Sequence, residues 1–237
     1  MRMSVLKNIL LFSVLSGINF YISLSSGCIP EKGLQDTPLK KQLIYNGKIW
    51  QNLYFRIKGN PFFLSGNFLT GNVIFNGKEF KNLKVKYDIC NDEVILYINP
   101  QTIITLNKEM VNEFTLEYQD TLHHILNMGN DSTSLLKGYN NLLYDGPTAL
   151  FVKYTKQVDI QSLNRLDDVF FQQHRIYIRK DSTIVQISGR RELFRLLGDR
   201  KTEIRSYVKR NRLNVNVTRK DPYSFVPVLQ FYDGKTR

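Results

Sequence analysis

The side chains best suited to acid–base or metal chemistry are three histidines: His123, His124 and His174. His123 and His124 are adjacent, and Glu117 and Asp120 precede them closely, so this stretch has the ligand types of a zinc site. Adjacent side chains, however, point to opposite sides of a strand, or about 100° apart on a helix, and seldom reach the same ion. We therefore interpret His123-His124 as the polar edge of a loop or short helix and predict no metal site.

Other catalytic patterns have little support. A serine hydrolase of the α/β type would need a G-x-S-x-G motif, and the sequence has none. Asp167-Asp168, or Glu109 with Glu113, would supply the two carboxylates of a glycosidase. Acid pairs are also common at turns, and the sequence does not give their separation in space. We predict no catalytic residue and no cofactor, and we favour a role other than that of an enzyme.

Positive charge gathers near the C-terminus. Between His174 and Lys220 there are 14 Lys or Arg against 4 Asp or Glu, in a chain whose formal net charge is +12. Ser188 to Asn211 has a helical period, and Ser188 is a suitable N-cap. Gly198-Asp199 either continues one helix or joins two short ones. The arc predicted to face the core contains Leu193, Phe194, Leu196, Leu197, Ile204, Tyr207 and Val208.

The opposite arc carries five cations: Arg191, Arg195, Arg205, Lys209 and Arg210. This strip is either the solvated outer face of a packed helix or a contact face for an anionic partner. Lipopolysaccharide phosphate, lipid headgroups and an acidic protein are the partners that we consider. A final segment that begins at Asp221-Pro222 and runs to Tyr232 also has helical character.

The first residues have the layout of a secretory signal peptide. Arg2 and Lys7 form a basic start, Ile9 to Leu24 are mostly apolar, and small residues follow. We assign residues 1–27 to the signal and expect export. A helix–Gly-Asp–helix pattern in a basic chain is similar to a DNA-binding motif, but an exported chain does not meet the chromosome. We therefore predict no nucleic-acid partner.

Cys28 directly follows the small residues Ser25-Ser26-Gly27. This position resembles the lipidated cysteine of the bacterial lipobox, although Ser25 stands where that motif usually has Leu. Either Cys28 is acylated, in which case its acyl chains anchor the protein to a membrane, or signal peptidase cleaves nearby. Acylation would leave Cys90 as the one other thiol, whereas without acylation a Cys28–Cys90 disulfide stays open.

The scaffold that would position these groups is centred on Gly59 to Ile98. Asn76-Gly77 separates two apolar runs and is typical of a type I′ hairpin, because both of its residues tolerate positive φ. Leu83 to Ile89 alternates apolar and polar residues, as a half-buried strand does. Val94 to Ile98 is apolar on both faces, and Pro100 should end this strand.

The stretch from Leu43 to Leu53 aligns without a gap with the one 30 positions later, and Asn46-Gly47 matches Asn76-Gly77. It predicts a first hairpin over Gln42 to Ile57. The match reflects either shared turn chemistry or a duplication inside one curled sheet.

Further strands are predicted at six places: Thr102 to Leu106, Glu113 to Tyr118, Gly138 to Tyr144, Ala149 to Lys156, His174 to Arg179 and Thr183 to Ile187. The predicted fold is α+β and mostly β, a curled antiparallel sheet with C-terminal helices packed on it. Residues 28–40 would be a tether, and residues 41–237 a single domain whose part from 188 to 237 is helical.

Three segments of the sequence resemble, in their order along the chain, those of a known group of proteins. In order they are GNPFFLSGNFLTGNVIFNGKEFKNLKVKYDICNDEVIL, then GYNNLLYDGPTALFVKYTK, then HRIYIRKDSTIVQISGRRELFRLLGDRKTEIRSYVKRNRLN with a closing FYDGK. This order resembles a group of uncharacterised exported proteins and lipoproteins of the Bacteroidota. The resemblance implies bacterial export and a β-rich body, and it assigns no catalytic or ligand-binding residue.

These observations favour an envelope protein, periplasmic and anchored through Cys28 to a membrane such as the inner face of the outer membrane. We expect a non-catalytic binding or accessory module with a basic C-terminal contact face. The alternative is an enzyme that acts on envelope glycans or lipids, or a lipid or lipoprotein carrier with an apolar cavity inside the curled sheet.

Overall fold

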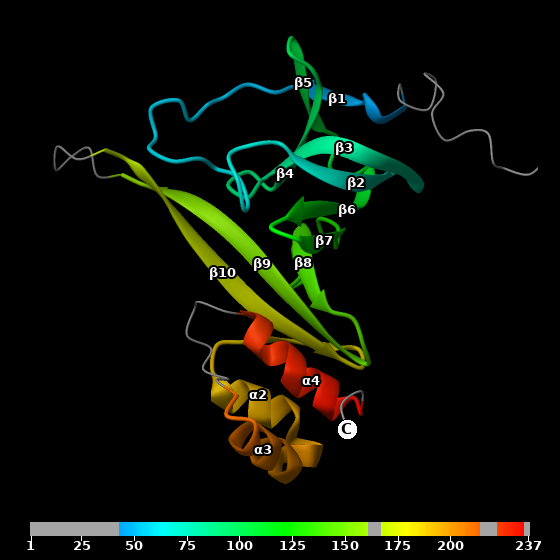
Figure 1. The fold of residues 1–237 in the computed structure, drawn as a ribbon, viewed down its shortest axis with the longest axis vertical. Coiled ribbons are helices and arrows are strands. Elements are labelled where there is room, and N and C mark those ends of the chain that lie inside the picture. The colour runs from blue at the N-terminus through cyan, green and yellow to red at the C-terminus, as the bar shows by residue number, and fades with distance from the viewer. Residues whose placement is uncertain (1–42, 161–166, 214–221, 235–237) are drawn as a thin grey trace, which may run out of the picture. The chain divides into compact units, whose positions relative to one another are not determined.

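The computed structural model describes residues 43–160, 167–213 and 222–234. The predicted signal peptide, the tether and Cys28 lie outside these residues. The described residues form one open antiparallel sheet of 11 strands, followed by the helices α2 (Arg190–Leu196), α3 (Lys201–Arg210) and α4 (Val226–Tyr232) (Figure 1). The predicted class, a mostly β chain with helices at its C-terminal end, is confirmed.

The first half of the sheet curls. Its strands stand in the order β1-β5-β4-β3-β2-β6, so β5 and β6 are four positions apart. In a flat sheet they would be about 19 Å apart, whereas the five Cα steps from Leu106 to Val111 span at most about 18 Å. The link also turns back, because Met110 N donates to Asn107 O at 3.1 Å. The sheet must therefore bend. The strands are β1 (Gly47–Ile49), β2 (Leu69–Phe75), β3 (Lys78–Asp88), β4 (Glu93–Asn99), β5 (Thr102–Leu106) and β6 (Val111–Tyr118).

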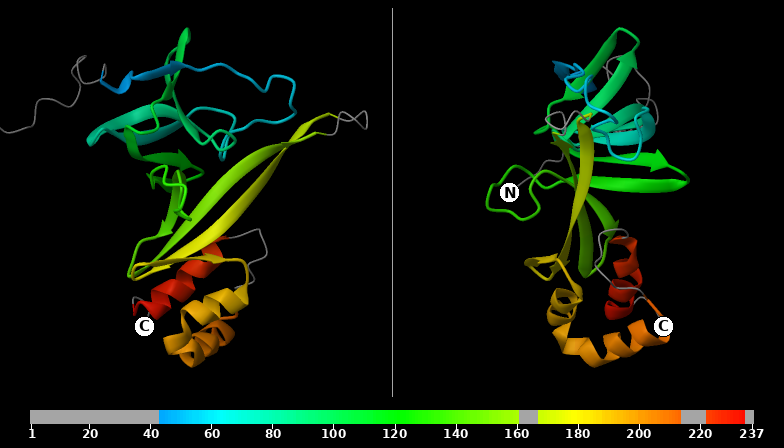
Figure 2. Two further views of the ribbon diagram at one scale, coloured as in Figure 1. Left: turned by 180° about the vertical axis from the view of Figure 1, so that it is seen from behind. Right: turned by 90° about the vertical axis from the view of Figure 1, so that its left-hand side faces the viewer.

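The second half is a plain meander from β6 to β11. Its longest strands, β9 and β10, pair over twelve residues each and form the ribbon that runs toward the helices (Figures 1 and 2). Every strand predicted in this half is present, β7 is additional, and β10 begins earlier than expected, at Val169. The strands are β7 (Thr121–Asn127), β8 (Tyr139–Tyr144), β9 (Thr148–Asp159), β10 (Val169–Lys180) and β11 (Thr183–Ile187).

The central hairpin forms as its turn residues predict. Asn76 and Gly77 have φ values of 50° and 72° and join β2 to β3. β4 ends at Asn99, directly before Pro100, which has no N–H to donate to a neighbouring strand.

The predicted hairpin over Gln42 to Ile57 is wrong. Asn46 and Gly47 do not have positive φ, and β1 pairs with β5 instead of folding back on itself. A Cβ on Gly47 would collide with the carbonyl oxygen of Thr105, so this glycine serves close pairing with β5. The same dipeptide therefore has a different role here. The apolar residues that follow it, Ile49 and Leu53, are exposed, and the chain does not fold back to pair them with a second strand of a hairpin.

The interior of the curled half is filled by aromatic rings. Tyr87, Phe114 and Tyr139 contact one another edge to face, with ring centroids 5.3 to 5.6 Å apart. Each of these side chains is at most 3% exposed. The space in which the carrier alternative places an apolar ligand is therefore occupied by the protein's own side chains.

The C-terminal helices pack on a second apolar cluster at the end of the β9–β10 ribbon (Figure 2). Five of the seven residues of the predicted inner arc are buried, and Leu196 and Tyr207 are partly buried. The predicted cap is wrong, because the helix N-cap is Gly189 and no side chain caps it. The elements are α2 (Arg190–Leu196), the 3₁₀ turn η2 (Gly198–Arg200), α3 (Lys201–Arg210), the 3₁₀ turn η3 (Pro222–Phe225) and α4 (Val226–Tyr232).

Of the two readings of Gly198-Asp199, the structure selects two short helices. The junction is tied down on both sides: Lys180 Nζ and Tyr232 Oη each donate to the Asp199 carboxylate at 2.8 Å. Arg200 Nη1 donates to the Tyr232 carbonyl at 2.6 Å. The hydrogen bond from Lys180 holds the pKa of Asp199 below its usual value, so the carboxylate stays charged at neutral pH.

Candidate anion-binding groove

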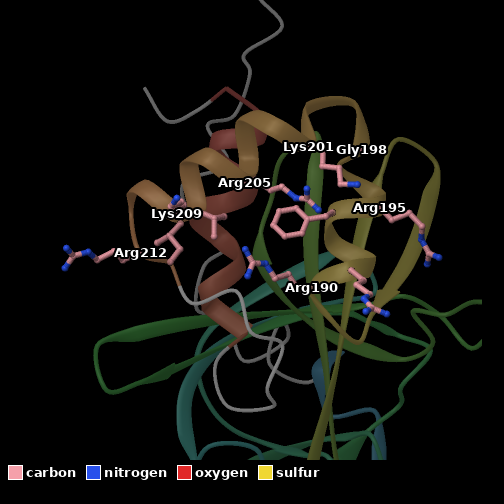
Figure 3. A pocket seen from close by; sticks show the side chains of 11 residues that line it. Arg190, Arg195, Gly198, Lys201, Arg205, Lys209 and Arg212 are labelled. Carbon is pink, nitrogen blue, oxygen red and sulfur yellow. The ribbon is translucent and has the colours of Figure 1, made fainter.

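An open groove of about 1330 Å³ runs along α2, η2 and α3 (Figure 3). Its bed contains Phe194, Gly198, Val208 and Leu213. No acidic side chain of the described residues lines it. Seven cationic side chains do: Arg190, Arg191, Arg195, Lys201, Arg205, Lys209 and Arg212.

The groove carries charge that the described residues around it do not neutralise. Among the described residues, none of the seven cations forms an ion pair with a carboxylate. Two of the acids nearby are already paired elsewhere: Asp199 with Lys180 at 2.8 Å, and Glu203 with Arg200 at 2.6 Å. Like charges this close repel one another and raise the free energy of the folded state, and a bound anion would relieve that repulsion.

Four of the five predicted contact residues come together here: Arg191, Arg195, Arg205 and Lys209 line the groove. Arg210 does not. It lines a separate hollow with Tyr207 and Phe231, because it is one residue, or about 100°, further round α3 than Lys209.

Sequence reasoning missed Arg190, Lys201 and Arg212. A single helical wheel separates these residues from the predicted strip, whereas the groove is lined by two helices and by the chain just after α3. The available signal was the excess of Lys and Arg along the whole stretch, which does not depend on the wheel.

Phe194 contacts two arginines of the groove. The residue is 6% exposed, and the Cζ atoms of Arg190 and Arg205 lie 5.1 and 5.4 Å from the centroid of its ring. These distances are within the range of cation–π attraction. Arg190 comes from α2 and Arg205 from α3, and both side chains reach into the space between the helices (Figure 3).

The histidines are placed differently from the loop or short helix that we predicted, because both His123 and His124 lie in β7. They do point to opposite sides. His123 is buried against the Phe63 ring, with centroids 5.6 Å apart, and burial lowers its pKa. His124 Nε2 lies 3.1 Å from Glu113 on the other face. The missed signal is the alternation in β7, where His123 and Ile125 face inward.

His174 lies on β10, with its ring centroid 5.9 Å from that of Tyr154, and burial lowers its pKa. In the part of the chain that the structure describes, no three potential metal ligands come together. Cys90, the thiol within the described residues, is free, and Tyr54 Oη lies 3.4 Å from its Sγ.

A second charged cluster ties the curled half to β9. The Asp92 carboxylate lies 2.6 Å from Lys108 Nζ and 2.9 Å from Lys153 Nζ. It also accepts a hydrogen bond of 2.7 Å from Tyr87 Oη. Burial raises the pKa of Asp92, but the lysines and Tyr87 outweigh burial and leave it below its usual value. This cluster joins strands that are distant in sequence.

Comparison with known proteins finds no match for this chain among family models, curated proteins or solved structures. No helix within the described residues is long and apolar enough to cross a membrane.

Proposed function

We propose that this protein is an exported, non-catalytic component of the bacterial cell envelope and that the groove along α2 and α3 binds an anionic envelope component. One observation carries the proposal. Seven cations line a single groove, and among the described residues none has a carboxylate partner. If this were only a solvated helix face, its charges would gain nothing by gathering in one groove. Solvation alone therefore does not explain why seven cations line it.

The N-terminal sequence supports the location. An apolar run that ends in small residues before Cys28 is the layout of an exported lipoprotein. An acyl anchor at Cys28 would hold the protein at a membrane surface, where lipid phosphates and anionic glycolipids are concentrated.

The test is charge reversal within the groove. Arg195→Glu, Arg205→Glu and Lys209→Glu change three exposed side chains that line it. We expect at least about tenfold weaker binding of the exported chain, kept in neutral detergent, to envelope extract captured on a sensor surface. The melting temperature should not fall, because exposed side chains contribute little to stability and the reversal relieves repulsion among the groove cations.

The matched control reverses three exposed lysines on β3, namely Lys78, Lys81 and Lys84. It alters net charge equally but leaves the groove intact, so binding should fall much less. Equal binding by the wild type and the groove variant would refute the proposal.

A further inference from the structure

Two cations of the groove differ from the other five because one aromatic ring holds both. The guanidinium carbons of Arg190 and Arg205 lie 5.1 and 5.4 Å from the centroid of Phe194. The two arginines come from different helices, α2 and α3, so the ring is a contact that both helices share (Figure 3).

This contact prepares the pair for a ligand. An arginine loses about 2 kcal/mol of side-chain entropy when it is fully immobilised. Phe194 imposes part of that restriction before any ligand binds, which lowers the cost of binding. Neither guanidinium is paired with a carboxylate of the described residues, so N–H donors of both stay available to an anion.

The chemistry of the pair selects the type of anion. Arginine offers a planar fork of donors that matches phosphate oxygens two at a time. A phosphomonoester carries about −1.5 to −2 charges at neutral pH, whereas a phosphodiester or a carboxylate carries one. A doubly charged group with three acceptor oxygens therefore best suits two guanidiniums that contact one ring.

The remainder of the groove indicates what carries the phosphate. Its volume of about 1330 Å³ exceeds the roughly 300–1,000 Å³ of ordinary small-molecule pockets. Phe194, Val208 and Leu213 add apolar side chains to its lining. A lining of both cationic and apolar side chains suits the boundary between a charged lipid headgroup and its first methylene groups.

We propose that the groove binds the phosphomonoester headgroup of a membrane lipid, and that Arg190 and Arg205, positioned by Phe194, hold the phosphate. This inference rests on the proposed function and specifies its ligand. The other five cations supply attraction without selecting the phosphate.

The experiment titrates the exported full chain, in neutral detergent, with three soluble probes. Dihexanoyl phosphatidic acid presents a phosphomonoester on a lipid, dihexanoyl phosphatidylglycerol presents a phosphodiester on the same chains, and inorganic phosphate has no lipid part. We expect phosphatidic acid to bind at least about tenfold more tightly than either of the others, by calorimetry.

Two double variants that lose the same charge distinguish preference for the phosphomonoester from general attraction of anionic lipids. Arg190→Gln with Arg205→Gln should abolish the preference for phosphatidic acid over phosphatidylglycerol. Arg195→Gln with Arg212→Gln removes two groove cations that do not contact the Phe194 ring, so both lipids should weaken and the preference should remain. Phe194→Leu keeps an apolar side chain at the buried site and should reduce the preference several-fold.

Each outcome decides. Equal affinity of the wild type for the two lipids, with binding retained, overturns the phosphomonoester inference and leaves the proposed function standing. Inorganic phosphate bound as tightly as phosphatidic acid overturns the lipid as its carrier. Absence of binding to every anionic probe overturns the lipid inference. If the charge-reversed groove variant also binds envelope extract as the wild type does, the proposed function is overturned as well.

Discussion

The Tyr144 hydroxyl donates a hydrogen bond of 2.8 Å to the Asp233 carboxylate, 89 residues further along the chain. Thr148 donates to the same carboxylate twice, through its backbone N–H at 3.1 Å and its hydroxyl at 3.0 Å. These bonds fasten the C-terminal end of α4 to the turn between β8 and β9. Because α4 in turn stacks on α3 through Phe231 and Tyr207, with ring centroids 4.0 Å apart, they also support the groove.

Asp233→Ala should therefore destabilise the fold. It removes three hydrogen bonds to one charged, partly buried acceptor, and we expect a loss of about 2–3 kcal/mol in the free energy of unfolding. Urea denaturation measures this loss. Asp167→Ala, at an exposed position, is the control and should change stability by no more than about 0.5 kcal/mol. Equal stability of the two variants would show that Asp233 does not fasten α4.

Asp92→Asn should change how stability depends on pH. Burial alone would raise the pKa of Asp92, but Lys153, Lys108 and Tyr87 lower it. A lowered folded-state pKa gives stability that is present above the unfolded value of about 3.9 and is lost as pH falls through the folded value. Asparagine tolerates the positive φ of 58° at this position, so the substitution removes the charge without straining the backbone.

The expected cost of Asp92→Asn at pH 7 is about 1–3 kcal/mol, because Lys153 is left largely buried without its carboxylate. The cost should be smaller at pH 2 than at pH 7, because Asp92 of the wild type becomes protonated as pH falls through its folded-state pKa. Urea denaturation at both pH values measures the two costs. The same cost at both values would contradict this role of Asp92.

Gly71→Ala should disrupt the join between the two halves of the sheet. Gly71 lies at the irregularity between β2 and β3, and a Cβ there would collide with the carbonyl oxygen of Thr115 on β6. We expect a loss of about 1–3 kcal/mol, measured as a shift in the urea midpoint.

Gly198→Ala is the matched control, because open space surrounds the position of its new Cβ and its φ is not in the left-handed region. It should leave stability unchanged or raise it slightly. Comparable losses in the two variants would mean that close approach to Thr115 is not the reason for Gly71.

The mass of the mature chain tests whether the protein is exported and anchored to a membrane through Cys28. If the protein is an exported lipoprotein, the intact mass of the purified chain should correspond to residues 28–237 with acyl groups on Cys28, and Cys28→Ser should release the chain from the membrane fraction. A mature chain that begins elsewhere and has no acyl group would refute the anchor while leaving the groove proposal intact.

Local chemistry made much of the fold predictable. Asn76-Gly77 predicted its hairpin because positive φ is required at both positions, and the apolar arc that contains Leu193 and Ile204 identified the buried side of the helices. The identical dipeptide Asn46-Gly47 misled us, because a turn also needs a second strand that gains by folding back. Here β1 gains more by pairing with β5, which lies far along the chain.

The sequence by itself determined the strand-rich class, the excess of positive charge and the residues of α2 and α3 that are buried. Tertiary structure alone decided that Arg190 joins Arg205 at Phe194 while Arg210 faces another hollow. The physical reason is that periodicity describes one helix at a time. A groove between two helices depends on how they meet, and here Asp199, Lys180 and Tyr232 hold the junction at which they do.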